Sequence, residues 1–338
     1  MHNWHLGIAG LYWLAIGTAF VAALLATPQV RRLALKVGVL DVVDERRMHS
    51  EPKPRIGGIA VYLGLATALF VTIGFALHTT LFHSANDTQD FFGLLFGGTL
   101  IMLVGVWDDV MGMRPRNKFI AQIVVAVISM IYGFHIPDFK IPGTAQYVNL
   151  PVWIDYPVTL VWYLGMMNAI NFLDGLDGLL AGVTAISGVF LFAIASAHQH
   201  VGAALVLCAL VGGALGFLPY NFSPAKIILG DTGSLFIGYV FATVSLLITA
   251  KIAVTVSLLV PLIALALPVL DTAAAILRRV RAGKAITEGD RGHFHHVLVF
   301  RFGLGVRQAV LLIYAVSFLL GAAAYLLSEG AGHLRRVI

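Results

Sequence analysis

The chain has 338 residues, of which 59% are hydrophobic and only 12% are charged, and its net charge is +5. Soluble proteins carry about a quarter of their residues as charged side chains, so this composition excludes an ordinary soluble enzyme. The single cysteine, Cys208, excludes a disulfide framework and a cysteine-based zinc site.

Ten apolar segments follow one another, each close to the length of about 20 residues with which a helix crosses a bilayer. We therefore expect an all-α polytopic membrane protein, folded as one integral domain over residues 1–338. The predicted spans are 6–27, 57–78, 91–107, 118–135, 156–172, 177–197, 201–218, 232–250, 252–277 and 306–327.

The distribution of positive charge orients these spans, because Lys and Arg favour cytoplasmic loops. With both termini outside, every Lys and Arg falls on the cytoplasmic side except Lys140, Lys251, Arg335 and Arg336. The Pro- and Gly-containing segment 136–155 is then expected to form a small outer hairpin.

The first polar segment, 46-RRMHSEPKPRIGGIAVYLG-64, places His49 and Arg55 before a Gly-Gly entry into the second span. These cations could bind an anionic substrate at the inner membrane surface. They could also act only as a signal for positive-inside insertion.

The second segment, 105-GVWDDVMGMRPRNKFIAQ-122, ends a span with Asp108 and Asp109. Acids so close to hydrocarbon are costly, and the negative end of the helix dipole disfavours them further. Such a pair can attract a cation, or one acid can serve as a base near neutral pH. Lys118, at the start of the next span, could hold a phosphate. The alternative is a solvated, salt-bridged turn.

The third segment, 168-NAINFLDGLDGLLAG-182, holds two amides and two acids. Asn168 and Asn171 are three residues apart and therefore share a helix face. Asp174 and Asp177 follow in a glycine-containing turn, where Asp177 could simply cap the next helix. Amide and carboxylate oxygens also suit Mg²⁺, whose shell is often completed by substrate phosphates.

The fourth segment, 229-LGDTGSLFIG-238, begins a span with Asp231. Asp231 could be an ordinary N-cap. A glycine-containing helix N-terminus is also a ready anion site, and an acid beside it can bring in the metal that bridges a diphosphate.

The fifth segment, 290-DRGHFHHVLVFRFG-303, contains Arg291 and three close histidines, His293, His295 and His296. The histidines lack the spacing of a helical zinc motif. We expect them to bind phosphate or sugar hydroxyl groups together with Arg291. Asp271, in the preceding span, is a candidate for orienting this loop.

Five segments thus bring acids, amides and cations to one face of the membrane. The pattern indicates an enzyme that joins an anionic, metal-bound substrate to a component of the membrane, with no nucleic-acid partner. A transporter or lipid flippase is the rival class, but transporter sites usually lie near the midplane of the bilayer.

Over about residues 46–303 these motifs resemble those of the polyprenyl-phosphate N-acetylhexosamine-1-phosphate transferases. The matching sequences are Pro-Arg-Ile-Gly-Gly, the Asp-Asp pair with its downstream Lys, Asn-Ala-Ile-Asn-x-x-Asp-Gly-Leu-Asp-Gly-Leu, Gly-Asp-Thr-Gly-Ser, Leu-Pro-x-x-Asp-Thr and His-x-His-His. The resemblance implies transfer of a sugar 1-phosphate from a UDP-sugar to a polyprenyl phosphate, with release of UMP.

The resemblance also implies roles for individual residues. Asp231 matches a Mg²⁺ ligand, with Mn²⁺ as the alternative ion, and Asn171 matches a second ligand of eukaryotic members. Asp108 and Asp109 match an acidic pair tied to activating or positioning the lipid phosphate, and Asp174 matches a residue near the uracil. The histidine loop is expected near the diphosphate and sugar, and family analogy suggests a homodimer in the bacterial inner membrane.

Two branches of the family compete. The motif 293-HFHH-296 resembles the GlcNAc-1-phosphate branch, which starts polymers such as O-antigen or wall teichoic acid. The peptidoglycan branch, which transfers phospho-MurNAc-pentapeptide, usually shows three consecutive histidines. We therefore expect UDP-GlcNAc and undecaprenyl phosphate as substrates, with phospho-MurNAc-pentapeptide transfer as the alternative.

Overall fold

The computed structural model describes residues 2–41, 52–77, 85–136, 138–140, 147–249, 265–281, 294 and 297–337, which are almost entirely helical. Their α-helices are α1 (His2–Val37), α2 (Gly58–Leu77), α3 (Ala85–Met111), α4 (Pro115–Ile131), α5 (Val152–Leu173), α6 (Leu179–Ala197), α7 (Val201–Asn221), α8 (Gly230–Thr249), α11 (Ala266–Arg281) and α13 (Val306–Val337). A short π-helix covers Val297–Arg301.

Within the described residues, seven helices are long and apolar enough to cross a membrane, namely α1, α2, α3, α6, α7, α8 and α13. This confirms the predicted polytopic membrane protein. Each predicted span overlaps a helix, although α4 has only 17 residues and residues 252–264 of the ninth span lie outside the described part.

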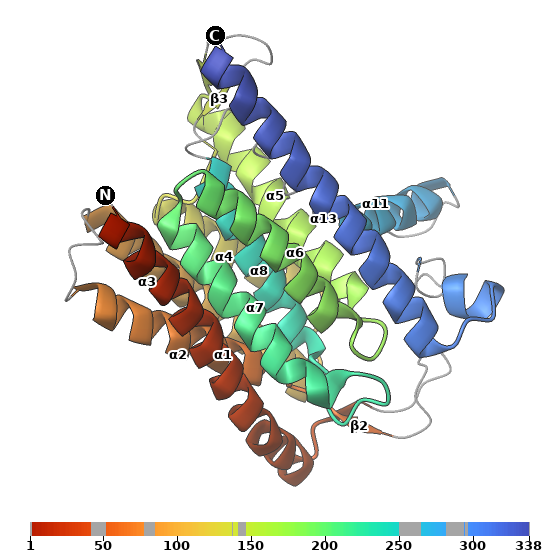
Figure 1. Cartoon of the computed structure of the whole chain (residues 1–338). Coiled ribbons are helices and arrows are strands. Elements are labelled where there is room, and N and C mark those ends of the chain that lie inside the picture. The colour runs from red at the N-terminus through yellow and green to blue at the C-terminus, as the bar shows by residue number, and fades with distance from the viewer. Residues whose placement is uncertain are drawn as a thin grey trace.

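The centre of the bundle is formed by α7 and α8 (Figure 1). Helix α7 packs against α1, α2 and α6, and α8 packs against α3, α5 and α2. Glycines allow the closest of these contacts: a Cβ at Gly212 would lie 2.3 Å from Ile16 O, and one at Gly216 would lie 2.3 Å from Phe20 O. The Gly-x-x-x-Gly spacing of α7 therefore lets the backbones of α1 and α7 meet, as in other membrane helix pairs.

Buried hydroxyl groups join the helices that carry most of the polar motifs. Ser129 of α4 donates to Tyr239 Oη of α8 over 3.0 Å, and Tyr163 of α5 hydrogen-bonds Thr243 of α8 over 3.0 Å. Such hydrogen bonds stabilise helix pairs in lipid, where water cannot satisfy these groups. They fix α4 and α5 on α8, and with them the side chains at the ends of these helices.

The hairpin predicted for segment 136–155 is present. Strands β3 (Asp138–Lys140) and β4 (Tyr147–Asn149) pair antiparallel, with Phe139 opposite Val148. The buried Asp155 in the first turn of α5 accepts hydrogen bonds from Ile136 N (2.9 Å) and His135 Nδ1 (2.6 Å). These bonds hold the residues that follow α4 against the start of α5. In Figure 1, β3 lies at the same end of the bundle as both ends of the chain, and β2 (Lys53–Pro54) lies at the opposite end.

Gly238→Ala should destabilise the protein by about 1–3 kcal/mol, the usual cost of overpacking. A Cβ at this position in α8 would lie 2.7 Å from Met167 Cα and 3.0 Å from Met166 O, backbone atoms of α5 that cannot rotate away. Thermal unfolding in detergent measures the effect. Gly74→Ala is the matched control, since no atom lies within 4 Å of its Cβ position, and it should unfold no earlier than the wild type. Equal unfolding temperatures for both variants would contradict the tight α5–α8 contact.

Candidate active site

The N-termini of α2 and α8 are joined side by side by the backbone. Gly57 N donates to Ile228 O and Gly58 N to Leu229 O, each over 2.9 Å, and Ile228 N donates to Pro54 O over 3.0 Å. A Cβ at Gly58 would lie 2.1 Å from Gly233 N, so no larger residue fits there without displacing the backbone. The Gly-Gly and Thr-Gly-Ser motifs therefore allow the starts of α2 and α8 to lie in direct contact.

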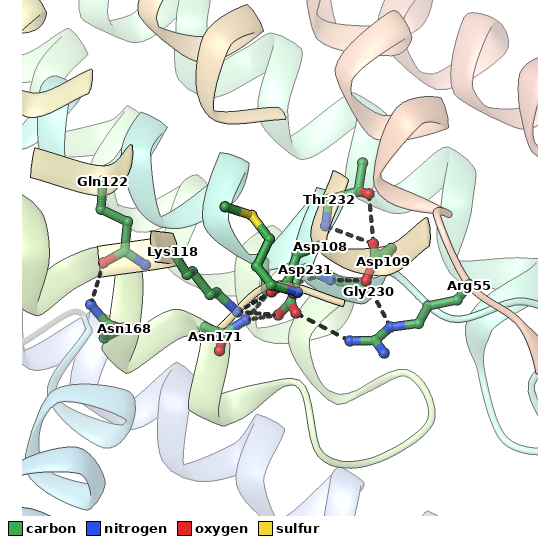
Figure 2. Close-up of polar contacts among 12 residues, drawn as sticks. Arg55, Asp108, Asp109, Lys118, Gln122, Asn168, Asn171, Gly230, Asp231 and Thr232 are labelled. Atoms are coloured by element: carbon green, nitrogen blue, oxygen red, sulfur yellow. Dashed lines mark hydrogen bonds and ion pairs between the residues drawn. The ribbon is translucent and has the colours of Figure 1, made fainter. Parts of the chain in front are cut away.

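Asp109, from the end of α3, caps the start of α8. Its side chain is completely buried (0% exposed). It accepts Asp231 N and Thr232 N, both over 2.9 Å, as well as Thr232 Oγ1 over 2.6 Å and Arg55 Nε over 2.7 Å (Figure 2). Both Asp109 oxygens are thus engaged by donors, and two N–H groups in the first turn of α8 are satisfied by this carboxylate. The predictions that Asp231 is the N-cap, or that these N–H groups bind substrate, are wrong.

Asp231 lies at the centre of the charged groups. Lys118 Nζ is 3.0 Å from its Oδ1, and Arg55 Nη2 is 3.1 Å from its Oδ2. Asn171 Nδ2 donates to Oδ1 as well (Figure 2). It also donates to Ser234 Oγ over 2.7 Å. Three segments far apart in sequence therefore converge on one carboxylate.

Asp108 differs from its neighbour Asp109 in both direction and exposure. Its Oδ2 is 2.9 Å from Lys118 Nζ, its Oδ1 accepts Met113 N over 2.7 Å, and its side chain is 11% exposed. The two acids diverge to different partners. Asp108 is the member of the pair that solvent or a ligand can reach.

Asn168 is held by a residue that the sequence did not single out. Its Nδ2 donates to Gln122 Oε1 and to Leu164 O, each over 2.8 Å. Gln122 is buried one helical turn after Lys118 on the same face of α4, and this spacing could have identified it. With both amide hydrogens engaged, Asn168 keeps its Oδ1 as an acceptor for a ligand.

Asp177 does not cap α6, so this reading of the motif is wrong. The N-cap is Gly178, in a left-handed conformation and without a side-chain cap. Asp177 Oδ2 instead binds Lys53 Nζ over 2.6 Å and accepts Ala225 N over 2.9 Å. The acid ties the turn after α5 to β2 and to the loop after α7, and Lys53 is a second residue that the sequence reading missed.

Charge and burial shift the pKa values of the groups in the connecting loops. Burial raises the pKa of Asp174 to about 7, and the charge of Asp231 adds to this while Arg55 opposes it. Burial would lower the pKa of Arg55, but the carboxylates of Asp109 and Asp231 outweigh it and hold the pKa above its ordinary value. Arg55 is therefore a permanent cation, whereas Asp174 titrates near neutral pH.

Asp174→Asn should flatten the pH dependence of stability in buffer without divalent ions. The folded state keeps the Asp174 proton up to about pH 7, whereas the unfolded chain loses it near pH 3.8. The Asp174 carboxyl thus stabilises the folded wild-type protein in acid, and this stabilisation is lost as the pH rises from about 4 to 7. Unfolding temperatures in detergent at pH 5 and pH 8 should therefore differ more for the wild type than for Asp174→Asn. Parallel profiles would contradict the shift.

Several predicted site residues lie outside the described residues: His49, Arg291, His293, His295 and His296. Phe294, within the same motif, is described, and its backbone N donates to Asp271 Oδ1 over 2.9 Å. This contact is in line with the prediction that Asp271 orients the loop, most of which lies outside the described residues.

Two cavities lie along elements that carry the polar motifs, although Asp108, Lys118 and Asp231 are not among the residues that line them. A cavity of about 470 Å³ with polar and apolar walls is lined by β2, the turn after α5 and the loop after α7, including Lys53, Gly175, Asp177 and Lys226. An apolar cavity of about 340 Å³ lies between α5 and α11, with Trp162, Met166, Ala169 and Val269 in its wall. Ala169 adjoins Asn168, so this cavity reaches the turn of α5 that carries the amides.

The oxygen atoms around Asp231 fit Mg²⁺ in kind, since a rotation of the Asn171 amide would add its oxygen to the Asp231 and Asp108 carboxylates and the Ser234 hydroxyl. In the described part of the chain no three His, Cys, Asp or Glu side chains form a ready-made metal cage. Mg²⁺ is often held by one or two carboxylates together with substrate phosphates and water. The donor set thus fits an ion that binds jointly with a phosphate.

Fold and site together define a polytopic membrane protein with charged side chains gathered where its helices end. A model of glycosyl transferase family 4 matches residues 91–249, which hold Asp108, Asp109, Lys118, Asn171 and Asp231. The chain belongs to this family, and the resemblance stated from its motifs is confirmed.

Relatives match along most of the chain. A Bacillus subtilis protein named as a probable undecaprenyl-phosphate N-acetylglucosaminyl 1-phosphate transferase is 36% identical, over 94% of this chain and 86% of its own. A decaprenyl-phosphate N-acetylglucosaminephosphotransferase of Mycolicibacterium smegmatis is 34% identical, over 88% and 77% respectively. A phospho-N-acetylmuramoyl-pentapeptide-transferase of Bacillus thuringiensis is 30% identical, over 93% and 94%.

Proposed function

We propose that this protein transfers N-acetylglucosamine 1-phosphate from UDP-GlcNAc to undecaprenyl phosphate, which gives undecaprenyl-diphosphate-GlcNAc and UMP. The observation that carries the proposal is the convergence of Asp108, Lys118, Asn171 and Asp231 at the place where several helices end. The reaction needs such a site, because it joins a water-soluble nucleotide sugar to a lipid. It would be the first membrane step of a cell-surface polysaccharide pathway.

The proposed topology is ten spans in a bacterial inner membrane, with both termini outside and the active site on the cytoplasmic face. The Lys and Arg distribution supports it, as does the position of both chain ends at the end of the bundle away from β2 (Figure 1). The lipid phosphate and a cytosolic nucleotide sugar would then meet at the inner surface. A homodimer is proposed on family analogy.

Asp231 and Asn171 would hold Mg²⁺, or Mn²⁺ in its place. The ion, when bound, neutralises charge on the diphosphate and on the departing UMP. The chain's own cations lie where they can add to this: Lys118 and Arg55 both reach Asp231.

Asp108 is the residue that we assign to the lipid phosphate. It is the more exposed acid of the pair, whereas Asp109 is enclosed by four donors. Asp108 would accept the proton of the lipid phosphate or orient its oxygen, which attacks the phosphorus next to the sugar in line. The new bond joins this phosphorus to the lipid phosphate, and the bond to the oxygen retained by UMP breaks. A phosphate monoester is already a competent nucleophile, so we favour direct attack over an aspartyl-phosphate intermediate.

Each of the two cavities would bind a different substrate. The cavity with Lys53 and Asp177 in its wall suits the nucleoside and lies beside Asp174 along the chain. The apolar cavity along α5 suits the first prenyl units, and its wall includes Ala169, next to Asn168 in the chain. The histidine loop, whose Phe294 donates to Asp271, would reach the diphosphate and sugar.

The test is an assay of UMP release with undecaprenyl phosphate and UDP-GlcNAc, UDP-GalNAc or UDP-MurNAc-pentapeptide. We expect release with UDP-GlcNAc. A preference for UDP-MurNAc-pentapeptide would favour the peptidoglycan activity named for the Bacillus thuringiensis relative. Uptake of substrate into vesicles without any UMP release would favour a transporter.

A further inference from the structure

Both oxygens of the Asp231 carboxylate are engaged by cationic side chains. Lys118 Nζ lies 3.0 Å from Oδ1, and Arg55 Nη2 lies 3.1 Å from Oδ2. A divalent cation bound to Asp231 would therefore meet two positive charges at close range, and like charges at this distance repel strongly in a poorly solvated site.

Each of the two cations has a second acidic partner. Lys118 Nζ is also 2.9 Å from Asp108 Oδ2, and Arg55 Nε is 2.7 Å from Asp109 Oδ1. Either side chain can therefore turn away from Asp231 without becoming an unpaired charge. Arg55 is pivoted at its Nε, since Asp109 holds that atom and only the terminal Nη2 reaches Asp231.

We propose that Lys118 and Arg55 compete with the divalent cation for Asp231, and that they move onto the diphosphate when the metal and the nucleotide sugar bind together. This inference rests on the proposed function, because it takes Asp231 as the metal ligand. It assigns each of these side chains two positions, one on Asp231 and one on a phosphate oxygen, with Asp108 and Asp109 as the fixed partners.

The competition makes metal binding and diphosphate binding cooperative. Without a diphosphate, the metal must displace two ion pairs, so it binds weakly. With a diphosphate present, the displaced cations gain new anionic partners, so the metal binds more tightly. Such coupling is reciprocal: the metal strengthens diphosphate binding by the same factor.

The test is the affinity of the chelator-stripped, detergent-purified protein for Mn²⁺, measured by the loss of the free-ion signal in electron paramagnetic resonance. Lys118→Met removes the charge but keeps the side-chain length, and it should bind Mn²⁺ about tenfold more tightly than the wild type in the absence of nucleotide. UDP should then strengthen Mn²⁺ binding less in Lys118→Met than in the wild type. Lys118→Arg keeps the charge and should match the wild type.

Lys53→Met is the matched control, since Lys53 pairs with Asp177 and makes no contact with Asp231 among the described ion pairs. It should leave the Mn²⁺ affinity unchanged, which separates local competition from a general effect of net charge. Should Lys118→Met not fold, Lys118→Gln provides the same comparison.

Mn²⁺ binding by Lys118→Met that is no tighter than in the wild type would overturn the inference. Asp231→Asn distinguishes this failure from failure of the proposed function. If Asp231→Asn loses Mn²⁺ binding while Lys118→Met gains nothing, only the competition is wrong. If Asp231→Asn binds Mn²⁺ as the wild type does, the metal assignment itself is wrong.

Discussion

Asp231→Asn should lower the rate of sugar-phosphate transfer by roughly a thousandfold, because metal stabilisation of transition-state charge amounts to several kcal/mol. The variant keeps the shape of the side chain but removes the charge on which Lys118, Arg55 and Asn171 converge. The measurement is Mg²⁺-dependent UMP release from UDP-GlcNAc in detergent, with the metal concentration varied.

The control for this variant is a test that it remains folded. The cap of α8 is Asp109, and its bonds to the backbone of residues 231 and 232 do not involve the Asp231 side chain. Asp231→Asn should therefore keep the start of α8 intact, and it should remain folded at the assay temperature although it loses the ion pairs with Lys118 and Arg55. Transfer at the wild-type rate and with the wild-type Mg²⁺ dependence would remove Asp231 from the metal site.

The helices could be predicted from the sequence because a membrane span leaves a direct compositional signal. A run of about 20 apolar residues has few alternatives to a helix in lipid, where every backbone group must be paired internally. The acids and amides stood out for the same reason, since polar groups at the edge of such runs are costly. Asp108, Lys118, Asn171 and Asp231 were therefore found from the sequence and lie together in the structure.

The partners of these residues could not be predicted, because they depend on contacts between distant segments. Asp177 stands where a helix cap is expected, yet it pairs with Lys53, 124 residues away in the chain. The spacing of Gln122 from Lys118 places both on one face of α4, but its partner Asn168 becomes known only once α5 packs against that face. The glycine-containing start of α8 suggested an anion site, whereas Gly233 lies against Gly58 and lets two helix N-termini touch.

The two members of the acidic pair should respond differently to the same substitution. Asp108→Asn should lower turnover by about 10²–10⁴, the usual contribution of a general base, with little change in unfolding temperature. Asp109→Asn should destabilise the protein by about 3 kcal/mol or more, because it breaks a buried ion pair with Arg55 and places an amide against the donors of Thr232. Thermal unfolding and UMP release, measured on both variants in the same detergent, separate the two effects.

This comparison tests the assignment of roles, since both residues stand in one motif and receive the same chemical change. When an acid with a structural role is replaced, the enzyme loses activity in proportion to the fraction of unfolded protein. The Asp109→Asn enzyme should therefore recover part of its activity on cooling. Added UDP-GlcNAc and Mg²⁺ should have the same effect, because they bind only the folded state. An enzyme that lacks a catalytic acid does not regain activity in this way, because the variant is folded from the start. Asp109→Asn with an unchanged unfolding temperature and no turnover would instead place Asp109 in the chemistry, and a normal rate for Asp108→Asn would remove Asp108 from it.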